Sequence, residues 1–371
     1  MSHNILIAPD KFKGTLTARE AASAIADGWR RARPDDSLDL LPMSDGGDGF
    51  GELLGAALGA EARTVETVDA AHRPCVGRWW WVEETKTALV ESANVIGLAM
   101  LPKGEFHPHE LDTQGLGEVL KDVARAGAKR CVIGIGGSAT NDGGTGMARR
   151  LGWRFISQGR SLERWPELNT LESVQRPAQD LGIDVIEVAV DVQNPLTGEM
   201  GCSAVYGPQK GLLPDEIELA DAAIRRLAEV TCAALGLEPE VPGDGAAGGL
   251  GLGLRCFVGG RLRPGFELFA DQIGFDARLA KVDLVITGEG SIDRSTLMGK
   301  GVGELAALCG EKEIPCIGLA GVAADAEELL GRFSEVAGIV GDVADEQEAL
   351  AEPAECLARL AAKVAAGLQD R

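Results

Sequence analysis

Short apolar runs alternate with amphipathic helical stretches at both ends of the chain. The first run is followed by a helical pattern that begins at the capping box Thr17–Glu20 and stops at Pro34. After Val282 the same alternation returns, and it ends in an acidic, alanine-rich helical stretch. The apolar runs cover residues 4–10, 38–43, 282–288, 315–321 and 336–341. This alternation predicts a parallel sheet covered by helices.

The middle of the chain has a different pattern. Apolar runs at 76–84 and 87–93 follow each other closely, which predicts a mixed or antiparallel element. The first run contains Trp79–Trp81, whose side chains should alternate between the two faces of a strand, in the core and at its rim. We therefore expect an α/β protein in which a discontinuous Rossmann- or flavodoxin-like parallel-sheet domain carries a second, mixed α/β domain as an insertion. The expected bounds are 1–65 with 280–371 for the first domain and 66–279 for the second, while residues 112–150 fit either.

The charge balance limits the partners. The 371 residues include 36 Lys and Arg against 57 Asp and Glu, a formal net charge of −21. Such a surface repels nucleic acid and anionic membranes, so an anionic small molecule would need a cleft in which lysines reverse the local potential. The N-terminal apolar run is too short for a signal peptide, and no run is long enough to cross a bilayer. We expect a cytoplasmic monomer or homodimer that acts on small molecules.

Cysteine and histidine spacing gives no metal motif. The eight cysteines are scattered without a C-x-x-C pair, whereas a disulfide scaffold or a structural zinc site needs clustering. The nearest approaches to ligand spacing are His72 with Cys75 and His107 with His109. Both pairs stand beside prolines in expected loops, so we interpret them as solvent-facing residues.

Three loops combine glycine with a carboxylate directly after an expected strand. They are the segments Pro9–Gly14, Ser44–Gly47 and Thr287–Asp293. Loops that follow parallel strands meet at one edge of the sheet, where ligands bind. Free backbone N–H groups and a lysine suit a phosphate or a carboxylate, and carboxylates suit Mg²⁺. One such loop would reflect the turn preference of Gly and Asp, but three at one edge favour a ligand site.

The middle region has polar loops of its own. An apolar strand delivers Asp191 directly into the turn Asn194–Pro195, a position typical of a base or a metal ligand. Gln209 and Lys210 add an amide and a cation in a second glycine-flanked loop. The glycine-rich stretch 242–249 opens a helical run of small residues, which suits either close helix packing or anion binding at a helix N-terminus.

The glycine-rich loop 133–147 has two competing interpretations. Gly134 and Gly136 follow an apolar run with the spacing of a dinucleotide-binding turn. That fold should place an acid roughly 20 residues further on to hold the ribose, but residues 157–159 are Ser-Gln-Gly. A P-loop is also missing, because the Gly-Lys pair in segment 299–301 is followed by Gly instead of Ser or Thr. An NAD(P)-dependent oxidoreductase is the weaker alternative, as is a non-catalytic protein that binds a small ligand.

Several long segments resemble the signature motifs of the bacterial glycerate kinase type 1 family. They read GIGGSATNDGGTGM, DVQNPLTG, GPQKG, PGDGAAGG and TGEGSIDRSTLMGK, and the N-terminal segments APDKFKGTLTA and SDGGDG match as well. The resemblance covers nearly the whole chain in the family's order, with departures at Lys11, at residues 111–118 and at Asp244. It implies two α/β domains, and transfer of the γ-phosphoryl group of ATP to D-glycerate with Mg²⁺. Relatives suggest 2-phosphoglycerate as the product.

The resemblance leaves the roles of individual residues to be argued from their chemistry. We expect Lys13 and Lys300 to hold anionic oxygens. Lys13 is predicted to be a catalytic residue. Glu289 and Asp293 should hold Mg²⁺ directly or through water.

Two aspartates compete for the role of general base. Asp191 should accept the proton of the attacking hydroxyl group, with Asp45 as the competing candidate. The residues expected around the substrate are Asp10, Ser138, Asn141, Asp142, Asn194, Gln209 and Lys210, and those around the nucleotide are Thr287, Gly288, Gly290 and Lys300.

Overall fold

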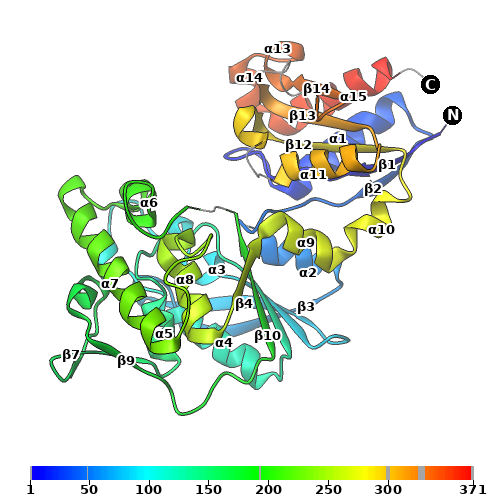
Figure 1. Ribbon diagram of the computed structural model, residues 1–371. Helices are drawn as coiled ribbons and strands as arrows, with labels where there is room; N and C mark the ends of the chain where they lie inside the picture. The colour runs from blue at the N-terminus through cyan, green and yellow to red at the C-terminus, as the bar shows by residue number, and fades with distance from the viewer. Residues whose placement is uncertain (1, 48, 192–193, 298–300, 325–330, 369–371) are drawn as a thin grey trace. The chain divides into compact units, whose positions relative to one another are not determined.

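The chain forms two compact units (Figure 1). The computed structural model describes residues 2–47, 49–191, 194–297, 301–324 and 331–368. The first unit combines residues 1–45 with residues 269–371, and the second consists of residues 46–268. Residues 46–65 and 112–150 thus lie in the second unit, and residues 269–279 in the first.

The first unit is built around a five-stranded parallel sheet with the order β14-β13-β12-β1-β2. Its strands are β1 (Asn4–Ile7), β2 (Ser37–Leu40), β12 (Leu284–Ile292), β13 (Cys316–Ala323) and β14 (Glu335–Gly338). β1 and β12 are direct neighbours, with Ile5 opposite Leu284, although they come from distant parts of the chain. This pairing confirms the prediction that both chain ends build one discontinuous parallel sheet.

Helices of the first unit pack against this sheet (Figure 1). They are α1 (Ala18–Ala32), α10 (Phe275–Leu279), η5 (Arg294–Leu297), α11 (Gly301–Glu311), α13 (Ile339–Asp342), α14 (Glu346–Ala351) and α15 (Pro353–Gly367). α1 begins at the predicted capping box, in which the Thr17 hydroxyl accepts the Glu20 N–H and the Glu20 carboxylate accepts the Thr17 N–H. α1 and α15 approach so closely that a Cβ on Gly28 would lie 2.0 Å from the Ala358 carbonyl oxygen. Apolar burial between α1, α13 and α15 and the strands β1, β12 and β13 forms the main core of this unit.

The second unit contains a six-stranded mixed sheet with the order β11-β10-β6-β5-β4-β3. Its strands are β3 (Glu61–Val68), β4 (Pro74–Val82), β5 (Thr87–Glu91), β6 (Arg130–Gly134), β10 (Val185–Val190) and β11 (Arg261–Pro264). β5, β6, β10 and β11 are parallel, whereas β3, β4 and β5 are antiparallel, which confirms the predicted mixed element. A small antiparallel sheet of β7 (Arg154–Ser157), β8 (Arg160–Ser161) and β9 (Ser173–Gln175) is added to it.

Helices of the second unit surround these sheets, and the tryptophans of β4 anchor them. The helices are α2 (Phe50–Ala57), α3 (Ala93–Ile96), η1 (Leu98–Met100), η2 (Pro108–Glu110), α4 (Gln114–Arg125), α5 (Thr145–Arg150), η3 (Trp165–Thr170), α6 (Cys202–Lys210), η4 (Pro214–Glu216), α7 (Ile217–Leu235) and α8 (Ala246–Val258), while α9 (Gly265–Ile273) crosses into the first unit. Trp79 and Trp81 meet edge to face on one side of the sheet. Trp80 points to the other side, where a Cβ on Gly51 of α2 would lie 2.3 Å from its ring. The predicted alternation is confirmed, but all three rings are buried and none lies at a rim.

Within the described part of the chain, no helix combines the length and apolar character needed to span a membrane.

Candidate active site

Three acidic residues interact at the carboxyl edge of the first unit's sheet. Asp10 follows β1, Asp45 follows β2, and Glu289 lies in the outer part of β12. Burial raises the pKa of Asp10 to about 7, and the negative charges of Asp45 and Glu289 add to the shift. The N–H group and the charge of Lys11 lower the same pKa without cancelling the rise. Such a cluster of interacting carboxyl groups marks a position where a cation is expected.

The loop after β1 is a tight turn that presents Lys13 to solvent. Phe12 and Leu16 pair across the turn through backbone hydrogen bonds of 2.9 and 3.0 Å. Gly14 supplies the left-handed backbone conformation, with φ of +84°. Lys13 is exposed next to it, and a Cβ on Gly290 would lie 3.3 Å from the Lys13 backbone nitrogen. The turn therefore brings the backbone of Lys13 to the end of β12, and the Lys13 side chain leaves this turn toward solvent.

Thr287 and Gly288 were predicted to contact the nucleotide, but both make contacts with neighbouring strands of the sheet. The Thr287 hydroxyl is buried and donates to the Ala8 carbonyl oxygen at 2.8 Å. A Cβ on Gly288 would lie 2.1 Å from the Leu319 carbonyl oxygen of the neighbouring strand, so only glycine fits there. These contacts favour a structural role for both residues.

Glu289 and Asp293, the predicted metal ligands, are joined by a hydroxyl group. Thr296 Oγ1 donates to Glu289 Oε1 at 2.8 Å and accepts the Asp293 N–H at 3.2 Å. Ser291 Oγ donates to Asp293 Oδ2 at 3.1 Å. The structure therefore brings these two acids into one network. Lys300 lies outside the described residues.

The second unit has its own polar cluster, where the loop after β6 meets the end of α6. Lys210 is buried, and its Nζ donates to the Thr140 carbonyl oxygen at 2.6 Å. Burial lowers the pKa of this ammonium group to about 8. Ser138 Oγ lies 2.9 Å from Thr140 Oγ1, and the fully buried Asn141 donates through Nδ2 to Ser203 Oγ at 2.9 Å. Asn141 Oδ1 has no hydrogen-bond partner among the described residues. A buried ammonium group beside hydroxyl and amide groups suits a small organic anion.

Asp142, predicted to contact the substrate, holds its own loop together. Its fully buried carboxylate accepts hydrogen bonds from the Thr113 N–H and hydroxyl at 3.1 and 2.8 Å. It also accepts the N–H groups of Gly144 and Gly146 at 3.2 and 2.8 Å. Burial, with a contribution from Asp112, raises its pKa despite these bonds. Four internal donors leave this carboxylate little capacity for a ligand, and they favour a structural role.

The glycines with dinucleotide-binding spacing face protein. A Cβ on Gly134 would lie 2.6 Å from Phe50 Cδ1, and a Cβ on Gly136 would lie 2.6 Å from Gly47 Cα. The Gly136 N–H also donates to the Gly46 carbonyl oxygen at 3.1 Å. Gly46, Gly47 and Phe50 of the same unit therefore fill the space that a pyrophosphate would need.

Glycines at the start and in the middle of α8 are likewise used for close packing. A Cβ on Gly248 would lie 2.0 Å from the Thr140 carbonyl oxygen, and a Cβ on Gly253 would lie 2.6 Å from the Gly143 carbonyl oxygen. Ala247 and the two residues after it have left-handed backbone conformations. Of the two interpretations of residues 242–249, these contacts favour close packing, which fixes the loop that carries Asn141.

Asp191 stands at the end of β10, beside a tyrosine. It is exposed, and its charge adds to the effect of burial in raising the pKa of Tyr206. The Tyr206 hydroxyl donates to Asn194 Oδ1 at 2.7 Å, while Asn194 Nδ2 donates to the Met200 carbonyl oxygen at 3.1 Å. Gln209 is exposed on α6. The amide of Asn194 is thus engaged within the protein, whereas Asp191 and Gln209 reach solvent.

Two polar residues at the end of β5 were not predicted from the sequence. Ser92 Oγ and Asn94 Nδ2 are buried without a hydrogen-bond partner among the described residues. They follow Glu91, whose carboxylate accepts the N–H groups of Gly49 and Gly51 at the start of α2. β5 and β6 are parallel neighbours, so Ser92 and Asn94 stand at the same sheet edge as the loop of Ser138 and Asn141. The available signal was the polar segment 91–94 directly after an apolar strand.

Comparison with known proteins assigns the chain to a family. The model of the glycerate kinase family matches residues 5–369. A protein of Bacillus subtilis named glycerate kinase is 36% identical, and the match covers 98% of this chain and 97% of the relative. A protein of Escherichia coli named glycerate 2-kinase is 37% identical, with 86% of each chain covered. The chain belongs to the glycerate kinase family.

A solved structure supports the fold of this family member. A protein of Salmonella typhimurium LT2 assigned as glycerate kinase 2 superimposes with a TM-score of 0.83 at 36% identity, and the match covers 99% of this chain and 98% of that one. Membership of the glycerate kinase family confirms the predicted resemblance and makes the chain a phosphotransferase. It speaks against the oxidoreductase alternative, as does the packing of Gly134 and Gly136.

Proposed function

We propose that the protein catalyses ATP-dependent phosphorylation of D-glycerate to 2-phosphoglycerate in the cytoplasm, as a monomer or homodimer. The observation that carries the proposal is the interaction of Asp10 with Asp45 and Glu289, which places three oxygen-donor acids at one sheet edge. Phosphoryl transfer needs positioning and charge neutralisation more than covalent chemistry. An acidic sheet edge provides the cation site that such a reaction requires.

The first unit is proposed to bind the nucleotide with Mg²⁺. Carboxylate and hydroxyl oxygens from Asp10, Glu289, Asp293 and Thr296 are the donor set that Mg²⁺ prefers, and no imidazole or thiolate competes among them. A bound Mg²⁺ neutralises charge on the phosphoryl oxygens. The raised pKa of Asp10 supports this assignment, because burial and the charges of Asp45 and Glu289 disfavour its ionised form and a bound cation would offset both effects. Lys13 at the adjacent turn, together with Lys300, would hold phosphate oxygens.

Thr287, Gly288 and Gly290 are proposed to contribute to nucleotide binding by shaping the strand end. Thr287 and Gly288 fix β12 between its neighbours through the contacts with Ala8 and Leu319. They thereby set the position of Glu289, and Gly290 leaves room for the Lys13 turn.

The second unit is proposed to bind the glycerate carboxylate through Lys210. Its ammonium group has donors to spare, because the Thr140 carbonyl oxygen engages one of three N–H bonds. Ser138, Asn141 Oδ1, Ser92 and Asn94 offer hydrogen-bonding groups for the two hydroxyls of the substrate. Asp142 and Asn194 would hold the surrounding loops, and the exposed Gln209 would contribute at the periphery.

Asp191 is the proposed general base, with Asp45 as the competing candidate. Asp191 is exposed at the end of β10, where its carboxylate can accept a proton from a substrate hydroxyl. Its influence on the pKa of Tyr206 supports its proximity to that phenol.

The proposed reaction is tested by incubating the protein with ATP, Mg²⁺ and D-glycerate and following the products by phosphorus NMR. We expect ADP and the resonance of 2-phosphoglycerate, and no reaction after removal of Mg²⁺ with EDTA. The matched control is L-glycerate, which has the same charge and hydroxyl groups. A 3-phosphoglycerate resonance would correct the position of transfer, and the absence of ADP formation with D-glycerate would refute the proposal.

A further inference from the structure

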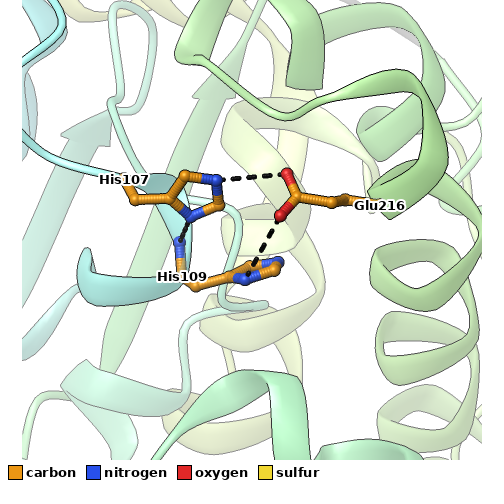
Figure 2. A group of neighbouring side chains, drawn as sticks. All are labelled: His107, His109 and Glu216. Carbon is orange, nitrogen blue, oxygen red and sulfur yellow. Dashed lines mark hydrogen bonds and ion pairs between the residues drawn. The ribbon is translucent and has the colours of Figure 1, made fainter.

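Two histidines and a glutamate form a compact cluster in the second unit, apart from the residues assigned above to substrate and nucleotide. His107 and His109 flank the start of η2, and Glu216 ends η4 (Figure 2). One ligand atom from each side chain lies within 4.8 Å of the others. The interpretation of the two histidines as solvent-facing residues is wrong for His109, whose side chain is only 19% exposed, while His107 is 36% exposed; both turn toward Glu216.

The ligand atoms have the spacing of a small-cation site. His107 Nε2 lies 3.1 Å from Glu216 Oε2, and His109 Nδ1 lies 3.9 Å from Glu216 Oε1. Nitrogen and oxygen ligands at about 2.0–2.2 Å around a tetrahedral Zn²⁺ lie roughly 3.3 Å apart. The two distances run to different carboxylate oxygens, and the complete set lies within 4.8 Å, so a cation would fit after side-chain movements that draw the three ligand atoms together.

The surrounding contacts hold this geometry in place. The Leu213 N–H donates to Glu216 Oε2 at 2.9 Å, which orients the carboxylate. Trp165 packs against the His109 ring with centroids 5.3 Å apart, and its Nε1 donates to the Pro108 carbonyl oxygen at 3.1 Å. Supporting contacts of this kind orient the ligands of metal sites.

The protonation states of the two imidazoles define what metal binding would cost. His107 Nδ1 accepts the His109 backbone N–H at 3.2 Å, so the neutral ring carries its proton on Nε2 and donates it to Glu216. Coordination through Nε2 requires the Nε2 proton to leave. If that proton moves to Nδ1 of the same ring, the hydrogen bond from the His109 N–H to Nδ1 must break. His109 Nε2 is buried without a hydrogen-bond partner among the described residues, so coordination through Nδ1 leaves the surroundings of that nitrogen unchanged.

We propose that His107, His109 and Glu216 form a zinc-binding site with one coordination position left to water. Two imidazoles and a carboxylate are a ligand set used by Zn²⁺, whereas Mg²⁺ prefers oxygen donors. The bound ion would link η2 to η4, which follows directly after the helix that carries Lys210. Because Zn²⁺ binds the deprotonated imidazole, binding would release protons and strengthen with rising pH.

Direct binding measurements test the site. Metal-free protein is titrated with ZnCl₂ against a chromophoric chelator in excess Mg²⁺, which occupies the oxygen sites. We expect one Zn²⁺ per chain, and a loss in affinity of about 100-fold or more in His109→Gln and in Glu216→Gln. Glu218→Gln and His3→Gln, which remove an exposed acid on α7 and a histidine of the first unit, should bind as the wild type does.

A second readout keeps the test independent of folding defects. Co²⁺ added to the wild-type protein should give visible absorption typical of tetrahedral nitrogen and oxygen ligands, and added Zn²⁺ should abolish it. Circular dichroism establishes that each variant is folded. Equal zinc affinity of wild type and folded His109→Gln, or the absence of both zinc binding and the cobalt spectrum in the wild type, would overturn the proposal.

Discussion

The Lys210 ammonium group donates a 2.6 Å hydrogen bond to the Thr140 carbonyl oxygen from a buried position at the end of α6. The same carbonyl oxygen would lie 2.0 Å from a Cβ on Gly248, so a glycine of the neighbouring stretch leaves room for this contact. The cation is therefore fixed against the loop that carries Ser138 and Asn141, and little freedom remains to be lost on ligand binding.

Lys210→Met should weaken glycerate binding while sparing the nucleotide. Charge-assisted hydrogen bonds contribute about 1.5–3 kcal/mol, so the KM for D-glycerate should rise about 10- to 150-fold. The KM for ATP should stay within about twofold. Steady-state kinetics with each substrate varied in turn measures both values. If Lys210→Met only lowers thermal stability and leaves the KM for glycerate unchanged, Lys210 is structural.

The wild-type pH profile provides an independent check on Lys210. Burial lowers the pKa of Lys210 to about 8, so its charge is lost as the pH rises above that value. The KM for D-glycerate should therefore increase above about pH 8, and this rise should be absent in Lys210→Met. A KM that stays constant to about pH 9.5 would contradict the assignment.

Asp10 should make the protein less stable as the pH rises. Its pKa is raised to about 7 in the folded protein from 3.8, so between these values the folded state holds a proton that the unfolded state has lost. The free energy of unfolding should fall over this window, by up to a few kcal/mol. Asp10→Asn should flatten the dependence, and Mg²⁺ should restore stability at about pH 8 in the wild type. Urea unfolding across the window measures the slope.

A matched control for Asp10→Asn is Asp35→Asn, which removes an exposed carboxylate of the same unit. It should retain the wild-type slope of stability against pH. Identical slopes for Asp10→Asn and wild type would show that Asp10 is not the titrating group.

Asp191→Asn separates the two candidates for the general base. The change keeps the shape but removes the proton acceptor, so kcat should fall by about 10²–10⁴-fold while the KM for ATP changes little. Asp45→Asn should instead raise the Mg²⁺ concentration needed for half-maximal activity, because Asp45 belongs to the acidic cluster with Asp10. Both substrates are varied for both variants. A kcat near wild type in Asp191→Asn, with a strong fall in Asp45→Asn, would reverse the assignment.

Asp142→Asn should destabilise the second unit. Three N–H groups and one hydroxyl point at this buried carboxylate, and an amide cannot accept from all of them. We expect a loss of roughly 2–4 kcal/mol in the free energy of unfolding, measured by urea denaturation. Ser138→Ala, in the same loop, should change stability much less. A normally stable Asp142→Asn with a raised KM for glycerate would instead restore the substrate-binding role predicted from the sequence.

The sequence predicted the discontinuous fold because its strands are uniformly apolar and separated by helical periodicity. β1 and β12 show this best, since the apolar runs around Ile5 and Leu284 become neighbours in one sheet. The polar loops after these strands were found for the same reason, because the carboxyl edge of a parallel sheet is fixed by topology. Asp10 and Glu289 could therefore be selected without a structure.

The sequence could not predict whether each polar side chain bonds to the protein or is left to bind a ligand. Thr287 and Asp142 look like ligand-binding residues, but their oxygens are occupied by the protein, a fact that depends on tertiary contacts with Ala8 and Thr113. Asn94 was missed for the opposite reason, since only the folded chain shows that its amide nitrogen has been buried without a partner. Hydrogen-bond satisfaction is a property of packing and leaves no periodic signal.

The pairing of β1 with β12 also constrains how the protein is made. Residues 46–268 separate the two segments of the first unit, so the whole second unit is synthesised before β12. Domains generally fold as units during synthesis, from the N-terminus onward. Here the N-terminal strands must wait, with the edge of β1 exposed to other chains, until Leu284 and the residues after it arrive. Co-translational folding therefore finishes the inserted unit first, and the nascent N-terminal segment is the part of the chain that most needs protection by a chaperone.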